Sequence, residues 1–267
     1  MSMNRRQFLK LASASTVLGV GGASVISNIG RGNLEAAQIH PDPRALKAKR
    51  WGFVVDVSKL STDEDYQKCV NACHDIHNVP NNPNPRHEVK WIWRDTYEHT
   101  FPNTAEDKIM NKELQEKNFL LFCNHCQNPA CVRVCPTKAT FKRASDGIVM
   151  QDMHRCIGCR FCMAACPFGA RSFNYTDPRP NIKVENKTFP TRMIGVVEKC
   201  TACYERLAIG QQPACAEASS GAIVFGDLDD PNSEVRKLIA EKYTIRRKPE
   251  LGTQPSIYYV IGGGEHA

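Results

Sequence analysis

Four short segments of the chain have the hydrophobic pattern of a regular element. The apolar run that begins at Trp51 predicts a buried strand, and the alternation over residues 90–94 predicts another. Between residues 137 and 152, two β-rich ends flank an Asp-Gly turn, which is typical of a short hairpin. Apolar residues at helical spacing over residues 233–243 predict an amphipathic helix. Long stretches between these segments have no clear period.

Cysteine is the unusual component of the composition. The chain has 267 residues, 42% of them hydrophobic, which is enough for one sizeable core or two small domains. It also has 13 cysteines, so thiols and not apolar burial alone are expected to organise the fold. The odd number leaves at least one thiol outside any pairing into disulfides or four-ligand sites.

Two cysteine runs have the spacing of iron–sulfur ligands. Cys156-x2-Cys159-x2-Cys162-x3-Cys166-Pro is the bacterial ferredoxin spacing, and the run that starts at Cys123 is the same with two extra residues. In two-cluster ferredoxins the fourth cysteine of each run ligates the other cluster. The spacing therefore predicts two [4Fe-4S] clusters, the first held by Cys123, Cys126, Cys131 and Cys166, the second by Cys156, Cys159, Cys162 and Cys135. Zinc or disulfides are the alternatives, although zinc usually takes two separated pairs and such crowding would strain most bridges.

A third run, Cys200-x2-Cys203-x11-Cys215, has only three cysteines. A serine stands where the fourth would fall, so this run needs a thiol from elsewhere, and only Cys69 and Cys73 remain. These two precede a histidine in a stretched form of the haem-attachment motif, and a haem site or a disulfide is the alternative there. Either would leave the third cluster one ligand short.

The N-terminus resembles a twin-arginine export signal. Arg5 and Arg6 precede Gln-Phe-Leu-Lys, and the uncharged stretch over residues 11–30 is too weakly apolar for a confident membrane span. Cleavage near residue 37 is expected, with an uncleaved anchor as the alternative. The formal net charge is +7, but no basic run with interleaved aromatics supports nucleic-acid binding. We therefore expect a periplasmic protein that lies on the extracytoplasmic face of the membrane and is attached to it through its partners.

Together these runs resemble the ferredoxin-type electron-transfer subunits that accompany molybdopterin oxidoreductases and NrfD-type membrane proteins, the NrfC, PsrB and DmsB type. That family has four runs, of which the second pairs with the third and the first with the fourth. Here the strand at Trp51 and Asp56 match the start of the first run, but residues 60–68 lack its first two cysteines. The resemblance implies that Cys73 completes a third [4Fe-4S] cluster with Cys200, Cys203 and Cys215. It also implies that Cys69 is not a ligand and that a fourth cluster is absent.

Within this family the chain is similar to the DsrO group, the periplasmic iron–sulfur subunits of the DsrMKJOP complex. The export signal, the altered first run and the segments 196–206 and 226–236 carry this resemblance. It implies electron relay in sulfite reductase-linked sulfur metabolism. The implied partners are an NrfD-type integral membrane subunit (DsrP), a triheme cytochrome c (DsrJ) and the other Dsr subunits, with no nucleic acid and no small-molecule substrate.

The function expected from these residues is that of an electron-transfer subunit that carries three [4Fe-4S] clusters and has no catalytic site of its own. It would relay electrons between a periplasmic cytochrome c and a membrane quinone-reactive subunit. A subunit of a molybdopterin reductase acting on polysulfide, dimethyl sulfoxide or nitrite is the main alternative. A redox sensor or maturation factor that uses Cys69 is another, and a thiol sensor requires an exposed cysteine of low pKa.

The expected fold is α+β, with two ferredoxin-like dicluster modules of short hairpins and helices and loop-rich insertions. Residues 1–37 would be the export signal and residues 48–267 the iron–sulfur domain. Residues 119–175 would form the core dicluster module, and residues 51–77 with 196–225 a second, one-cluster module. Trp91 and Trp93 are expected to cover a small core or pack over a cluster, with a partner contact as the alternative.

Overall fold

The computed structural model describes residues 42–105 and 112–261. All of them belong to one unit of the chain, Asp42–Ala267. The export signal expected over residues 1–37 lies outside the described residues. Among those described, no helix is long and apolar enough to cross a membrane.

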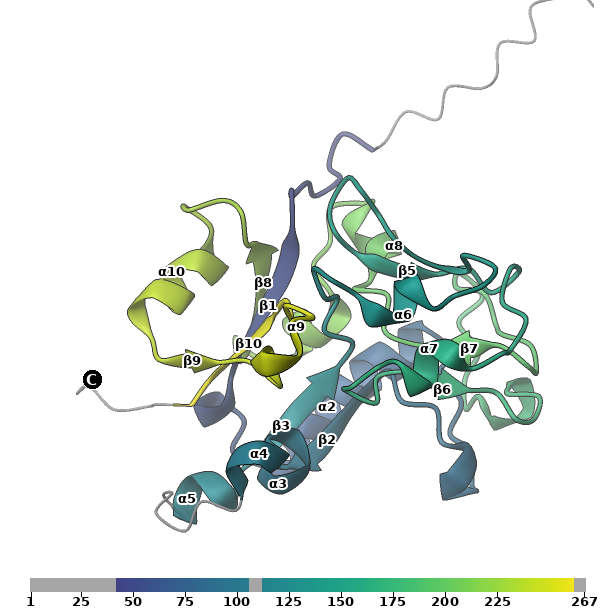
Figure 1. The fold of residues 1–267 in the computed structure, drawn as a ribbon, viewed down its shortest axis with the longest axis horizontal. Helices are drawn as coiled ribbons and strands as arrows, with labels where there is room; N and C mark the ends of the chain where they lie inside the picture. Colours follow the sequence, from purple (N-terminus) through teal and green to yellow (C-terminus); the bar gives the residue numbers. More distant parts are fainter. Residues whose placement is uncertain (1–41, 106–111, 262–267) are drawn as a thin grey trace, which may run out of the picture. The chain divides into compact units, whose positions relative to one another are not determined.

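A four-stranded sheet joins distant parts of the sequence (Figure 1). Its order is β8–β1–β10–β9, with bounds Ile223–Asp227, Trp51–Asp56, Ile257–Val260 and Thr244–Ile245. β1 is buried along its whole length and runs parallel to β10 and antiparallel to β8. The strand predicted at Trp51 is confirmed, whereas the C-terminal strand that pairs with it was not predicted.

Helix α10 (Glu234–Glu241) covers one face of this sheet. Its Val235 side chain is fully buried in a small cluster with Val54, Leu228 and Val260. Ser233 caps the helix by accepting a hydrogen bond from the Arg236 amide at 3.4 Å. The predicted amphipathic helix is therefore confirmed.

Helix α2 (Asp63–Ile76) carries Cys69 and Cys73 on its buried face. Thr62 and Asp65 form a reciprocal capping box at its start. Three acidic residues in the first turn interact favourably with the positive end of the helix dipole. The helix packs against α9 (Ala214–Ala218), which carries Cys215. Cysteines that are far apart in the sequence thus come to neighbouring helices.

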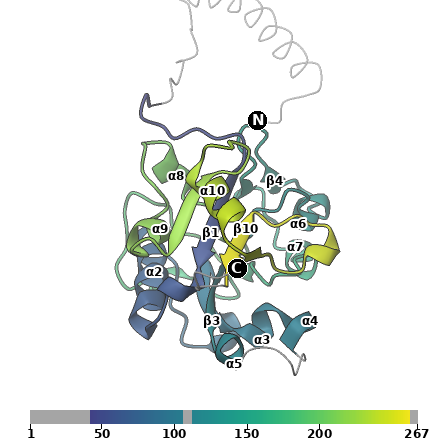
Figure 2. The ribbon, with the colours of Figure 1, turned by 90° about the vertical axis from the view of Figure 1, so that its left-hand side faces the viewer.

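Strands β2 (Ile92–Thr96) and β3 (Asn118–Phe122) form an antiparallel pair that contributes side chains to the main core. Phe119 to Phe122 are almost completely buried, and the chain reaches Cys123 directly after them. Three short helices, α3 (Tyr97–Thr100), α4 (Pro102–Ala105) and α5 (Lys112–Gln115), lie together at one end of β3 (Figure 2).

The remaining elements are short and surround the cysteine runs. Strands β4 (Thr140–Lys142) and β5 (Val149–Gln151) form the predicted hairpin, with Gly147 at φ +76° in its turn. A second two-stranded pair is β6 (Ser172–Phe173) with β7 (Val197–Glu198). The other helices are α6 (Ala130–Arg133), α7 (Phe161–Ala164), α8 (Tyr204–Leu207) and the 3₁₀ turns Val57–Lys59, Pro85–His87, Arg179–Asn181 and Pro249–Leu251. The described residues form a small mixed α/β fold, and their division into two modules stays a prediction.

Candidate metal centres

The structure describes all 13 cysteines, and none of them forms a disulfide. They are described below in the three predicted sets of four, with Cys69 left over. Sulfurs of the first and third sets act as charged neighbours of one another, and those of the second set line one cavity.

The first set contains Cys123, Cys126, Cys131 and Cys166. Burial raises the pKa of Cys126 to about 12, and the sulfurs of Cys123, Cys166 and Cys131 add to the rise. Burial also raises the pKa of Cys166, again with Cys123 and Cys131 as its charged neighbours. Cys166 therefore lies near thiols of the other run, and the crossover ligand set stays a prediction.

The second set contains Cys135, Cys156, Cys159 and Cys162, which line one cavity. Although burial raises the pKa of Cys135, amide donors from Thr140, Thr137 and Ala139 bring it below its usual value. The Thr140 amide lies 3.4 Å from the Cys135 sulfur. Such N–H···S bonds favour a thiolate, which is the form that binds a metal.

The third set contains Cys73, Cys200, Cys203 and Cys215. Burial raises the pKa of Cys73 well above its usual value. The negative charges of Cys203, Cys200 and Cys215 raise this pKa further. Cys73 lies on α2, Cys200 and Cys203 lie just before α8, and Cys215 lies on α9. All four are buried. Assignment of the three sets as ligands stays a proposal, but each set offers four sulfurs.

Cys69 is the thirteenth cysteine, and it is a charged neighbour of Cys215 of the third set. It is fully buried, and burial raises its pKa to about 11. A thiol sensor needs the opposite environment, exposed and of low pKa, so this cysteine does not fit that function. Ser219 does not take the missing position either: its hydroxyl donates to the Ala216 carbonyl at 2.7 Å and accepts from the Ile223 amide at 2.9 Å.

Two buried cations lie at the junctions between the sets. Although burial lowers the pKa of Arg171, nearby sulfurs of the first and second sets raise it. Burial lowers the pKa of Lys199, whose charged neighbours include Cys123 of the first set and Cys200 of the third. Its ammonium donates to the Val149 and Cys200 carbonyls. The first set therefore adjoins both of the other sets.

Sequence reasoning did not find these two cations. Lys199 directly precedes a cysteine, which could have served as a signal. Nothing in the sequence distinguishes Arg171 from the many exposed arginines.

Several buried polar atoms beside the cysteines have no hydrogen-bond partner within the described residues. They include both side-chain polar atoms of Asn124, Nε2 of His125, Nη2 of Arg171 and Oγ1 of Thr201. Buried donors are rarely left unpaired in a finished site. The inorganic sulfides of a cluster accept hydrogen bonds, and four thiols are the usual protein ligands of a [4Fe-4S] cluster. The residues present therefore fit three such clusters.

A buried ion pair connects the helix of Cys73 to the strand before Cys200. Arg192 Nε lies 2.7 Å from the Glu198 carboxylate, and the two side chains are 3% and 0% exposed. Glu198 also accepts from Trp91 Nε1 at 3.0 Å. The same guanidinium donates to the carbonyls of His77 and Asn78, just after α2. This network holds together two segments that supply the third set.

Trp91 is thus part of the core, in line with the expectation that it covers one. It is 1% exposed and stacks on His77, with ring centroids 4.7 Å apart. His77 Nε2 lies 2.7 Å from Glu205, beside Cys203 of the third set. Trp93 is only half-buried, with its indole nitrogen 3.4 Å from Asp95.

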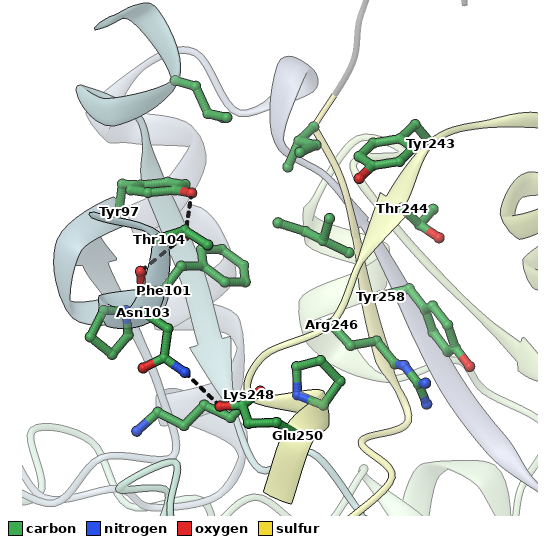
Figure 3. Close-up of a pocket in the computed structure, with 15 residues that line it drawn as sticks. Tyr97, Phe101, Asn103, Thr104, Tyr243, Thr244, Arg246, Lys248, Glu250 and Tyr258 are labelled. Carbon is green, nitrogen blue, oxygen red and sulfur yellow. Dashed lines mark hydrogen bonds between the residues drawn. The ribbon is translucent and has the colours of Figure 1, made fainter. Parts of the chain in front are cut away.

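An open pocket of about 660 Å³ lies elsewhere, between the α3–α4 segment and residues 243–261 (Figure 3). Tyr97, Phe101 and Tyr258 line it, and Asn103 bridges to Glu250 at 2.7 Å. No cysteine lines this pocket. It therefore offers no ligand to the centres described above.

Comparison with known proteins defines the class. The profile of the 4Fe-4S dicluster domain matches residues 117–179, which contain the first and second sets. This is a ferredoxin-like iron–sulfur protein that carries [4Fe-4S] clusters.

The family follows from longer matches. The chain is 39% identical over 287 residues to the Hdr-like menaquinol oxidoreductase iron-sulfur subunit 1 of Archaeoglobus fulgidus, covering 98% of this chain and 100% of that protein. It is 32% identical over 262 residues to Protein NrfC of Escherichia coli (strain K12), covering 97% and 96%. The chain belongs to the family of iron–sulfur electron-transfer subunits that contains these two proteins. A shorter match, 48% identical over 141 residues, links 52% of the chain to 53% of the iron-sulfur subunit of a putative dimethyl sulfoxide reductase from Halobacterium salinarum.

Proposed function

We propose that this chain is an electron-transfer subunit with three [4Fe-4S] clusters. It would belong to a membrane-bound redox complex that exchanges electrons with quinones and supports sulfur metabolism. The arrangement of the thiols supports the proposal: three candidate sets of four sulfurs, with the first set next to both of the others. When bound, [4Fe-4S] clusters accept and donate one electron at a time. A row of such centres conducts electrons without any substrate site.

The residues of the chain set the properties of this row. Thiols hold the clusters, amides such as that of Thr140 donate to sulfur, and Arg171 and Lys199 offset negative charge at the two junctions. Hydrogen bonds to sulfur and buried positive charge both favour the reduced, more negative state. The third set is fully buried, whereas three thiols of the second set are half-exposed.

The quinone partner is supported by the full-length relative that is named as a menaquinol oxidoreductase subunit. The sulfur-metabolism role rests on the resemblance to the DsrO group. Under this proposal the partners are an NrfD-type membrane subunit (DsrP) and a triheme cytochrome c (DsrJ), on the periplasmic side after twin-arginine export. The specific complex and the location are inferences from the sequence.

A molybdopterin oxidoreductase subunit is the second candidate function. The match to a dimethyl sulfoxide reductase subunit favours it, since that match has the higher identity. It covers only about half of either chain, however, and the first cysteine run here lacks two thiols. Purification of the complex from native membranes separates the candidates, because one predicts a multihaem cytochrome and the other a molybdopterin subunit.

The ligand sets are tested by replacing two cysteines of one helix. Cys73→Ala should remove one cluster, seen as loss of about a third of the iron and of one signal in the electron paramagnetic resonance spectrum of the reduced protein. Cys69→Ala, the matched control one turn away, should leave iron and spectrum unchanged. Equal loss from both variants, or none from Cys73→Ala, would mean that the third set is wrongly assigned.

A further inference from the structure

The second set of thiols lies nearer to solvent than the others, under an unusual surface. Two large apolar side chains next to its cysteines point outward: Ile157 is 67% exposed and Phe161 is 59% exposed. Apolar side chains of this size are usually buried or covered by a partner when they gather in a patch.

A neighbouring loop extends this surface. The Gly195 carbonyl packs so closely on Gly158 that an added Cβ there would lie 2.4 Å from its oxygen. Met193 and Ile194, 47% and 56% exposed, directly precede Gly195, so this approach brings their segment of the chain close to that of Ile157. The Gly195 amide also donates to the Asn174 carbonyl at 2.8 Å, next to the exposed Tyr175. We call these five apolar residues the apolar face: Ile157, Phe161, Tyr175, Met193 and Ile194.

Cationic side chains lie on the segments that adjoin the apolar face. Thr137, Ala139, Ile157 and Arg160 line the same cavity, which places Lys138 near this face. Arg155, which pairs with Asp152 at 3.2 Å, directly precedes Cys156. The exposed charged side chains of residues 131–163 are cationic, among them Lys138, Arg155 and Arg160. The Arg160 guanidinium lies over the rings of Phe173 and Tyr175, 5.5 and 6.0 Å from their centroids.

We infer that the apolar face is the docking site for a protein redox partner whose contact surface is apolar at its centre and acidic at its rim. The inference rests on the proposed electron-transfer function and adds the place where electrons enter or leave. An apolar centre with aromatic and arginine side chains is typical of a protein interface, and its charged rim speeds the encounter with a partner of opposite sign. Docking here brings the partner next to Cys156 and Cys159, two of the three half-exposed thiols of the second set.

The test measures electron transfer from the purified, dithionite-reduced holoprotein to two oxidised probes, an acidic monohaem cytochrome c and a basic mitochondrial cytochrome c. Each ferric haem that becomes ferrous takes one electron from the chain. At low salt the acidic probe should react at least tenfold faster than the basic one, and added salt should abolish the difference. Equal rates, or a preference for the basic probe, would overturn the inference.

Variants then locate the site. Arg155→Glu with Arg160→Glu should remove the preference for the acidic probe. Because these residues adjoin ligands, Ile194→Glu serves as a second variant outside the cysteine runs, and it should slow the acidic probe about tenfold. Tyr243→Glu is the matched control, since Tyr243 is 67% exposed and lies between α10 and β9, across the fold from α7 (Figure 1). An equal effect of Tyr243→Glu would contradict the assignment.

The iron content of the purified protein distinguishes failure of the docking site from failure of the electron-transfer function. Full iron with no charge preference overturns only the docking site, whereas a chain without iron overturns the electron-transfer function as well. Sedimentation of the wild type and Ile194→Glu tests a second copy of the chain as the occupant. A dimer that Ile194→Glu dissociates would also overturn the inference.

Discussion

Removal of the Arg192 guanidinium should destabilise the protein and its third set of thiols together. Arg192→Met leaves the Glu198 carboxylate, which is 0% exposed, without its ionic partner at 2.7 Å. It also removes the donors to the carbonyls of His77 and Asn78, which follow the helix of Cys73. The uncompensated buried charge is the main cost.

The size of the effect follows from this burial. Breaking a buried ion pair by deleting one partner costs about 3–5 kcal/mol. With a urea m-value of about 3 kcal/mol/M for a chain of this size, the unfolding midpoint should fall by about 1 to 1.7 M. Such a loss is a large fraction of the about 5–15 kcal/mol by which proteins are stable.

The assay is anaerobic urea unfolding followed by the visible absorbance of the clusters and by circular dichroism. The double variant Arg192→Met/Glu198→Gln removes the stranded charge but keeps an acceptor for Trp91. It should recover more than half of the lost midpoint. If the midpoint of the double variant falls by the sum of the decreases in the two single variants, the buried charge is not the cause and the reasoning is refuted.

Three further changes test other parts of the structure. Lys199→Met should lower the midpoint potentials of the centres on both sides of it, while Lys199→Arg should preserve them, as measured by redox titration. Gly158→Ala should cost about 1–3 kcal/mol in the same urea assay, because its backbone has φ +68° and the new Cβ meets the Gly195 carbonyl; an unchanged midpoint would contradict the close approach. Burial raises the pKa of Tyr259 from 10 to about 12, so the native state retains this proton between pH 10 and 12 after the unfolded state has lost it. Stability should therefore fall by about 3 kcal/mol over that window, and less steeply in Tyr259→Phe.

Local features of the fold and site were predictable from the sequence. The cysteine runs have fixed spacings because one short loop must wrap one cluster, and the β4–β5 hairpin follows from its turn and flanking residues. The amphipathic helix α10 is equally local. In each case the signal and the structure lie within about twenty residues.

Long-range features were not predictable in the same way. The parallel pairing of β1 with β10 joins segments about 200 residues apart, and no residue pattern encodes that partner. Cys69 and Cys73 are four residues apart on one helix, so spacing places both on the same face. Only the packing of α2 brings Cys73 to the third run. The role of Lys199 depends on its complete burial, which a charged residue in a sequence does not reveal.

The central claim is that three sets of four thiols hold three [4Fe-4S] clusters. Iron and acid-labile sulfide analysis of the anaerobically purified chain tests it most directly. Three cubanes predict about twelve irons and twelve sulfides per chain. About eight irons would mean that Cys73 and the third run hold no cluster, and about sixteen would mean that Cys69 helps to hold a fourth.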